Sequence, residues 1–129
     1  MRRGFVCLIV AAAATAMAPQ ARAEAMQPRQ FLAMLDALEA RVAQIDALDR
    51  RGVTRLGADL LRHIDTAAEV AWVGDEERRD DARRICGLAG ANLHWVFGLR
   101  RLGDPEQARA LPLYQKSKTV CARKAGVAP

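Results

Sequence analysis

Apolar residues recur at alternating steps of four and three along much of this chain, a spacing that places them on one face of a helix. The first such series starts near Pro28, where proline suits the first helical turn, and stops at Gly52,. Its apolar positions are Phe31, Leu35, Leu38, Val42 and Ile45. The pattern predicts an amphipathic helix that buries one face.

A second series predicts another one-sided helix, which is capped near Thr54 and ends at Gly74,. Its apolar stripe consists of Leu56, Leu60, Ile64, Ala67 and Ala71. His63 borders this stripe, and Asp59 precedes His63 by about one helical turn,. Two such side chains are too few for a metal site, so we expect His63 to be a structural or surface residue.

The third predicted helix differs from the first two because its middle carries no charge. It starts at Asp75 and runs to Leu102, before Gly103. Residues 85–99 contain no Asp, Glu, Lys or Arg. A surface helix normally keeps a charged face in water, so we expect this segment to be the central helix, covered on most sides.

The fourth predicted helix opens with Asp104 as its cap and Pro105 in its first turn,. One side of this helix presents Leu111, Tyr114, Cys121 and Ala122. Proline in a helix interior removes a backbone hydrogen bond and crowds the preceding turn. Pro112 is therefore expected to kink or break the fourth helix.

Short loops at the three predicted turns make consecutive helices antiparallel neighbours. The sequence therefore predicts an all-α fold, a small up-down-up-down four-helix bundle. In that bundle Cys86 and Cys121 are equally far from the 103–104 junction, at about 26 Å for a rise of about 1.5 Å per residue. Because the two thiols stand level on the third and fourth helices, we predict a disulfide between them.

Residues 1–23 have the composition of a cleavable export signal,. Arg2 and Arg3 precede an apolar run, and small residues surround a cleavage point after Ala23. We expect a single helical domain over 24–129, periplasmic or secreted, where thiols are oxidised and Cys7 has left with the signal,. The paired arginines also fit the twin-arginine route, so ordinary and folded export both remain open.

Basic side chains concentrate near the end of the chain. Loss of the three signal arginines lowers the formal net charge from +5 to +2, yet residues 100–124 hold seven basic side chains against two acidic ones. We expect this region to bind a macromolecular partner, either an acidic protein face or an anionic envelope polymer or lipid surface, and not nucleic acid. The expected contacts are Arg100, Arg101, Arg109, Lys116 and Lys118. The alternative is an ordinary solvated helix.

His94 supports a second hypothesis, a small-molecule site. Gly87, Gly90 and Gly98 fall on the same side of the third helix as His94, where they leave a strip with almost no side chain,. Such a groove could admit a flat, haem-like cofactor beside an axial imidazole. The alternative is that a neighbouring helix packs closely against the glycines.

This placement resembles that in the periplasmic four-helix b-type cytochromes, which have similar lengths and use a methionine of the first helix and a histidine of the last. Here the match fails, because His94 is on the third helix and Met26 and Met34 fall near the opposite end of the bundle. The sequence contains no Cys-x-x-Cys-His, which excludes covalent haem attachment,. We also find no nucleophile, base and orienting group at a recognisable spacing. The primary prediction is therefore a non-enzymatic binding protein without a cofactor.

Overall fold

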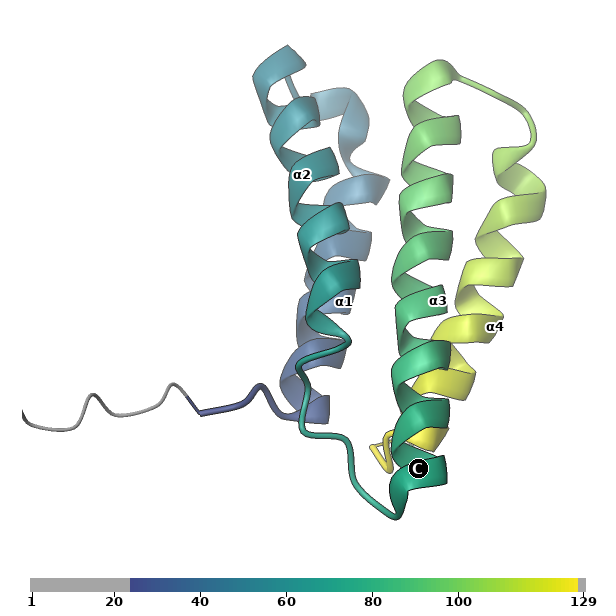
Figure 1. Ribbon diagram of the computed structural model, residues 1–129. Helices are drawn as coiled ribbons and strands as arrows, with labels where there is room; N and C mark the ends of the chain where they lie inside the picture. Colours follow the sequence, from purple (N-terminus) through teal and green to yellow (C-terminus); the bar gives the residue numbers. More distant parts are fainter. Residues whose placement is uncertain (1–23, 128–129) are drawn as a thin grey trace, which may run out of the picture.

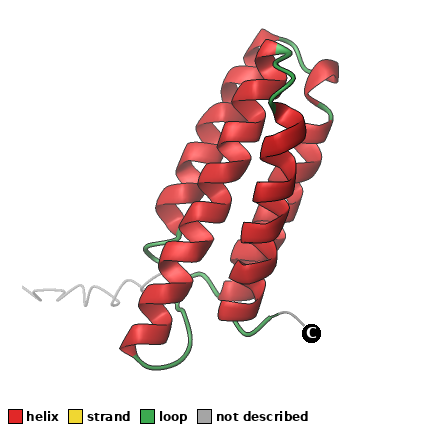
Figure 2. Ribbon diagram, turned by 90° about the vertical axis from the view of Figure 1, so that its right-hand side faces the viewer, coloured by secondary structure: helices red, strands yellow, loops and turns green. Residues whose placement is uncertain are grey.

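Four helices in antiparallel order make up the fold in the computed structural model, which describes residues 24–127 (Figure 1). In chain order they are α1 Pro28–Ala43, α2 Arg50–Thr66, α3 Glu76–Leu102 and α4 Gln107–Lys124, with a 3-10 turn, Ile45–Ala47, between the first two. The helices lie side by side with their loops at the two ends of the bundle (Figure 2). The predicted all-α four-helix bundle is confirmed, and the predicted signal over 1–23 lies outside the described residues.

The core forms where the apolar faces of all four helices meet. Its members include Phe31, Leu35, Leu56, Leu60, Trp72, Leu93, Phe97 and Tyr114. Full burial of a side chain of this size contributes roughly 1.5–3 kcal/mol before the loss of conformational entropy is counted. Every apolar position predicted for the first helix is buried, so its periodicity identified the core-facing side correctly.

The junction between α1 and α2 differs from the predicted one. α1 ends at Ala43 and not at Gly52. The cap of α2 is Asp49, whose carboxylate accepts a hydrogen bond from the backbone N–H of Gly52 at 2.7 Å. Thr54 lies inside α2, where its hydroxyl donates to the carbonyl of Arg50 at 3.0 Å. Asp is at least as good a helix cap as Thr, so α2 starts earlier than predicted.

α2 ends well before the predicted Gly74 because tertiary contacts take over its last hydrogen bonds. The backbone N–H of Ala71 donates to the carbonyl of Met26 at 2.9 Å. The carbonyl of Ala67 accepts instead from the indole N–H of Trp72 at 2.8 Å. In a longer helix these two backbone groups would bond to each other. Burial of Trp72 therefore overrides local helix propensity, and Gly74, with a φ of +104°, turns the chain into α3,.

Both ends of α3 fall where the sequence predicted them. The carboxylate of Asp75 accepts a hydrogen bond from the backbone N–H of Arg78 at 2.9 Å. Gly103 ends the helix with a φ of +64°, a left-handed conformation that glycine adopts without a side-chain clash,. These two stops fix the length of the helix that carries the predicted functional residues.

The start and the interior of α4 correct two predictions. α4 begins at Gln107, and the carboxylate of Asp104 accepts from the N–H of Glu106 at 2.9 Å in the turn before it. The predicted break at Pro112 is wrong, because α4 continues through this residue to Lys124. Proline removes one backbone hydrogen bond, and the extensive packing of α4 against α3 compensates for this loss,.

The uncharged segment of α3 is covered on most sides, as predicted, because only Leu88, Ala91 and Trp95 are exposed over residues 85–99. The other three helices all contact α3, and on its one open side Leu88 and Trp95 keep 49% and 40% of their surfaces exposed. Each helix of a four-helix ring keeps an outer side, so the uncharged segment over 85–99 presents an apolar strip to solvent. This strip does not indicate a membrane span, because none of the four described helices has the length and apolar content to cross a bilayer.

Candidate partner-binding face

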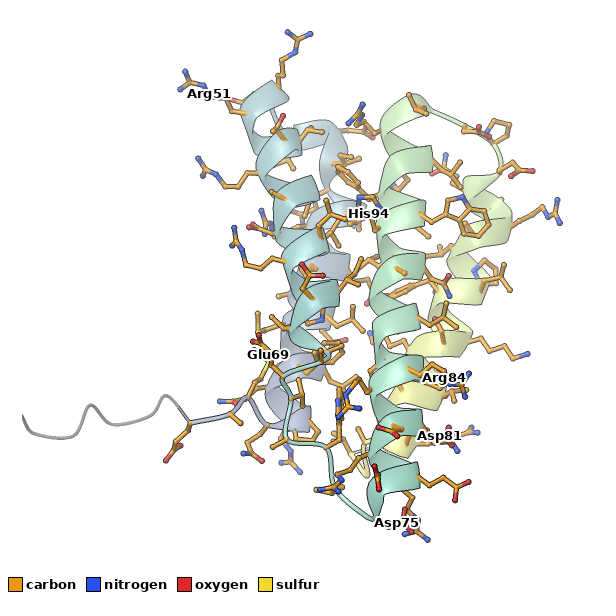
Figure 3. The ribbon with its side chains drawn as sticks, viewed as in Figure 1. Arg51, Glu69, Asp75, Asp81, Arg84 and His94 are labelled. Atoms are coloured by element: carbon orange, nitrogen blue, oxygen red, sulfur yellow. A yellow bond between two sulfur atoms is a disulfide. The ribbon has the colours of Figure 1, made fainter. Side chains whose placement is uncertain are left out.

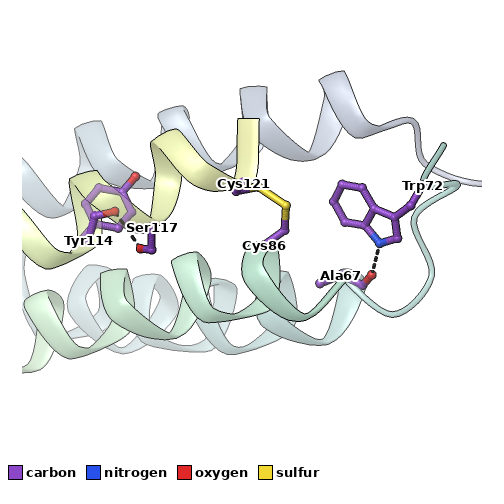
Figure 4. The surroundings of a disulfide bond; sticks show 6 residues. All are labelled: Ala67, Trp72, Cys86, Tyr114, Ser117 and Cys121. Atoms are coloured by element: carbon purple, nitrogen blue, oxygen red, sulfur yellow. Dashed lines mark hydrogen bonds between the residues drawn. A yellow bond between two sulfur atoms is a disulfide. The ribbon is translucent and has the colours of Figure 1, made fainter. Parts of the chain in front are cut away.

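A disulfide joins the two helices that carry the candidate site. The sulfur atoms of Cys86 on α3 and Cys121 on α4 lie 2.04 Å apart, as predicted (Figure 4). Along the same interface, the side-chain amide of Asn92 donates to the hydroxyl of Ser117 at 3.1 Å. That hydroxyl donates to the carbonyl of Tyr114 at 2.8 Å. These links fix α3 against α4, so a surface shared by the two helices is preorganised.

Lys118, one of the predicted partner contacts, faces α1. Its ammonium group pairs with the carboxylates of Asp36 and Glu39, the latter at 2.9 Å. Burial alone would lower the pKa of Lys118, but the hydrogen bonds and charges of the two carboxylates outweigh it and raise the pKa. Lys118 is therefore neutralised within the bundle, where it ties α4 to α1.

Two further predicted contacts are engaged within the protein. The guanidinium of Arg100 donates to the backbone carbonyl of Ala43, the last residue of α1, at 3.1 Å. Arg109 lies 3.6 Å from the carboxylate of Glu106, but both side chains are exposed. An exposed pair of this kind contributes little, so Arg109 can exchange it for a partner's carboxylate. The predicted basic region therefore does not form one continuous surface.

An apolar surface lies between α3 and α4 on the outside of the bundle. Leu88 of α3 and Leu113 of α4, which is 51% exposed, line a groove of about 370 Å³. Lys116 and Val120 line the same groove. Trp95 follows Leu88 by about two turns on the same side of α3,. We call the surface formed by these five residues the α3–α4 face.

Basic side chains border the α3–α4 face on its α4 side. Lys116 is part of the groove itself. Arg101 and Trp95 line a neighbouring hollow towards the end of α3. On α4, Arg109, Leu113 and Lys116 follow one another at the spacing of neighbours on a helix surface,. Of the five predicted partner contacts, Arg109 and Lys116 thus lie at this face. Arg101 instead projects from another side of α3, in the hollow that also contains His94,.

Asp81 marks the lower end of the face in the view of Figure 3, near Arg84. Its carboxylate contacts the side chains of Lys124 and Arg84, each at 3.3 Å. The hydrogen bond from Lys124 and then the one from Arg84 lower the pKa of Asp81. Because Asp81 is balanced by two cations, it adds no unpaired negative charge to this end of the face.

The glycine strip of α3 is filled by α2 over most of its length. A β-carbon at Gly90 would lie 3.1 Å from Cγ1 of Ile64, and one at Gly87 would lie 3.9 Å from Cβ of Ala67. At Gly98 no described atom comes within 4 Å of that position. Close helix packing, the alternative considered from the sequence, therefore occupies the strip at two of its three glycines.

His94 lies on the α2 side of α3, towards the end of the strip that stays open (Figure 3). It shares a shallow hollow of about 400 Å³ with Trp95 and Gly98. Its ring centroid is 5.9 Å from that of Phe97. Because α2 fills the strip below this hollow, the described residues leave no continuous groove for a flat ligand along the glycines.

His63 is the buried histidine, although the sequence placed it only at the border of an apolar stripe. It is 2% exposed, and its ring stacks on Phe31 with 4.1 Å between centroids. Neither ring nitrogen has a hydrogen-bond partner among the described residues. Burial lowers the pKa of His63 from 6.5 to about 4, so the ring is neutral at pH 7. Its spacing from Leu60 and Ala67 is that of the stripe itself, and this signal could have identified it,.

Comparisons with protein-family models, curated proteins and solved structures found no match to this chain. Within the described residues, no three or more His, Cys, Asp or Glu side chains are grouped so as to hold a metal ion. The α3–α4 face and the buried imidazole of His63 are therefore the two candidate sites among the described residues.

Proposed function

We propose that the mature chain is a non-enzymatic exported protein that binds an acidic segment of a partner protein on its α3–α4 face. The proposal is carried by the exposure of Leu88, Trp95 and Leu113 on one rigid helix pair with basic side chains around them. Contiguous exposed apolar groups with a polar rim are typical of interaction surfaces.

The shape of the face favours a helical partner segment. Two antiparallel helices leave a long hollow between them, which a third helix can occupy with apolar residues at positions i, i+3 or i+4, and i+7. Trp95 is suited to anchor this contact, because tryptophan and arginine supply much of the binding energy at protein interfaces. Arg109 and Lys116 would face acidic residues that flank the apolar stripe of the partner,.

An anionic envelope polymer or a lipid surface fits the face less well. A polymer of phosphate or sugar-acid groups has no apolar stripe to cover Leu88 and Leu113. A flat bilayer surface does not follow a groove between two helices. The combination of apolar groove and basic rim therefore favours a protein partner over the other two classes.

The export part of the proposal accounts for the bridge between α3 and α4, because disulfides persist in oxidising compartments. Mass spectrometry of the periplasmic fraction and of the medium tests this part. We expect a chain that begins at Glu24, with Cys86 and Cys121 oxidised. A chain that retains residues 1–23, or that carries two free thiols, would contradict export with signal cleavage.

Tryptophan fluorescence tests the binding part, with a short synthetic helical peptide as the probe. The peptide presents leucines on one face and glutamates beside them, and a control peptide has lysine in place of each glutamate. We expect the emission of Trp95 to shift to the blue as the acidic peptide covers its exposed ring. The Trp72→Phe background removes the signal of the other tryptophan.

Charge reversal at the rim provides the matched comparison. Lys116→Glu should weaken binding of the acidic peptide by about tenfold or more, because it places like charges opposite each other. Arg51→Glu reverses a charge at the start of α2, away from the α3–α4 face (Figure 3), and should leave the affinity unchanged. Equal affinities of the two variants would overturn the proposal. So would binding to vesicles that contain phosphatidylglycerol without binding to the acidic peptide.

A further inference from the structure

A pocket between α1 and α2 lies outside the α3–α4 face. Its volume is about 250 Å³, and its lining surface is mostly apolar. Met34, Ala37 and Leu38 line it from α1, and His63 and Thr66 line it from α2, with Arg41, Asp59 and Arg62 completing the lining. The hydroxyl of Thr66 donates to the carbonyl of His63 at 2.6 Å, so this hydroxyl proton is already used.

The imidazole of His63 is the unexplained group in this pocket. Both of its nitrogens are buried without a hydrogen-bond partner among the described residues. A neutral imidazole carries one N–H donor and one acceptor nitrogen, and a buried polar group that stays unpaired destabilises a fold. Phenylalanine would fill the same position and stack on Phe31 without that cost. A histidine at this position therefore suggests that one of its ring nitrogens forms a hydrogen bond with a group from outside the apolar core.

We infer that this pocket binds a small uncharged aromatic molecule with a single hydroxyl or N–H group, of the phenol or indole class, and that a ring nitrogen of His63 is its hydrogen-bond partner. The inference does not depend on the proposed partner protein, since the pocket and the α3–α4 face lie on different helix pairs. The surface of the pocket is mostly apolar, and its charged side chains, Arg41, Asp59 and Arg62, already pair with one another. A charged ligand would lose its hydration there, so the pocket favours an uncharged one.

The size and the walls of the pocket fit this ligand class. An apolar cavity of about 150 Å³ is enough to hold benzene in another protein, so about 250 Å³ admits one or two rings,. The thioether of Met34 makes favourable contacts with aromatic rings. Neither ring nitrogen of His63 is open to solvent, so a ligand reaches one only when a lining side chain moves. Met34 is 42% exposed, and its flexible side chain can move aside to admit the ligand,.

Methyl NMR of protein labelled at its methionine methyl groups tests the inference. We expect phenol and indole to shift the Met34 resonance and to leave that of Met26, which does not line the pocket, in place. Benzene should bind at least about tenfold more weakly than phenol, because it cannot form the hydrogen bond to His63. This comparison uses the natural protein and requires no variant.

Two substitutions sharpen the result. His63→Phe should abolish the preference for phenol over benzene, whereas His94→Phe should preserve it. Equal binding of benzene and phenol, or no shift of the Met34 methyl at millimolar phenol, would overturn the inference. Cu(I) alone is the competing probe, since a thioether and an imidazole are suitable ligands for it. Cu(I) binding that requires Met34 and His63, without phenol binding, would replace the inference by a metal site.

Discussion

The two helix pairs of this bundle are held together in different ways. α3 and α4 share a disulfide, from Cys86 to Cys121, and make the most extensive contact in the fold. α1 and α2 have no covalent link, and their contact includes an ion pair between Arg41 and Asp59 at 2.8 Å. The ring of His63 packs on α1 with both nitrogens unpaired among the described residues.

Each helix pair carries one feature that costs stability: exposed apolar side chains on α3 and α4, and a buried imidazole without a hydrogen bond between α1 and α2. The covalent link keeps α3 and α4 together while Leu88, Trp95 and Leu113 stay exposed on their outer side. α1 and α2 expose fewer large apolar side chains, Met34 and Leu61, and their unfavourable feature is a polar ring inside the core. We interpret both features as binding sites, one for a macromolecule and one for a small molecule.

Removal of the disulfide should have the largest effect on stability. The bridge spans 35 residues of chain, for which the chain-entropy model gives about 4 kcal/mol of stabilisation. Urea unfolding of the double variant Cys86→Ala with Cys121→Ala should show a loss of this size. Reduction of the natural protein should give a similar loss. A change below about 1 kcal/mol would show that packing alone holds both pairs.

Acidification should weaken the fold through His63. Burial lowers its pKa from 6.5 to about 4, so the unfolded chain takes up a proton in this window and the folded protein does not. The free energy of unfolding therefore falls as the pH drops from 6.5 to 4, by on the order of 3 kcal/mol, and this contribution stays constant above that window. Denaturant unfolding at a series of pH values measures it.

The matched variants separate His63 from the carboxylates that also titrate at low pH. His63→Phe should remove this part of the pH dependence, and His94→Gln should keep it. Arg41, Asp59 and Arg62, the charged groups that line the pocket of His63, are common to all three proteins. Identical pH profiles for the natural protein and His63→Phe would contradict the assignment.

The smallest expected effects on stability come from substitution of Lys118 and Lys116, which we expect to have different roles. Lys118→Met leaves Asp36 and Glu39 without their shared cation, and should lower the free energy of unfolding by about 1 kcal/mol or less, since the group is partly solvated. Lys116→Met should change stability by less than about 0.5 kcal/mol and weaken binding of the acidic peptide. Thermal unfolding and peptide titration of both variants should show this exchange of roles, and the reverse pattern would contradict it.

Local sequence patterns predicted the helices but not all of their boundaries. Gly103 and Asp75 bound α3 as predicted because cap and turn residues act locally. The end of α2 could not be predicted in this way. It depends on Met26 accepting the N–H of Ala71 and on burial of Trp72, which are contacts formed only in the folded protein.

The candidate sites were harder to predict than the fold. Composition identified a basic region, but Lys116 and Lys118 are two positions apart and therefore point to different sides of α4,. One lies at the groove beside α3 and the other pairs with α1. The exposed strip with Leu88 and Trp95 could not be located from the sequence, because an uncharged segment indicates burial but does not show which side stays open.

The indole N–H resonances of the two tryptophans provide the most direct test of the proposed binding face. Trp95 lies on the α3–α4 face, whereas Trp72 is 5% exposed and donates its indole N–H to Ala67. In nitrogen-15 NMR spectra, the acidic helical peptide should shift the Trp95 resonance and leave the Trp72 resonance in place. A shift of Trp72 alone, or no shift of either at millimolar peptide, would contradict binding at the α3–α4 face.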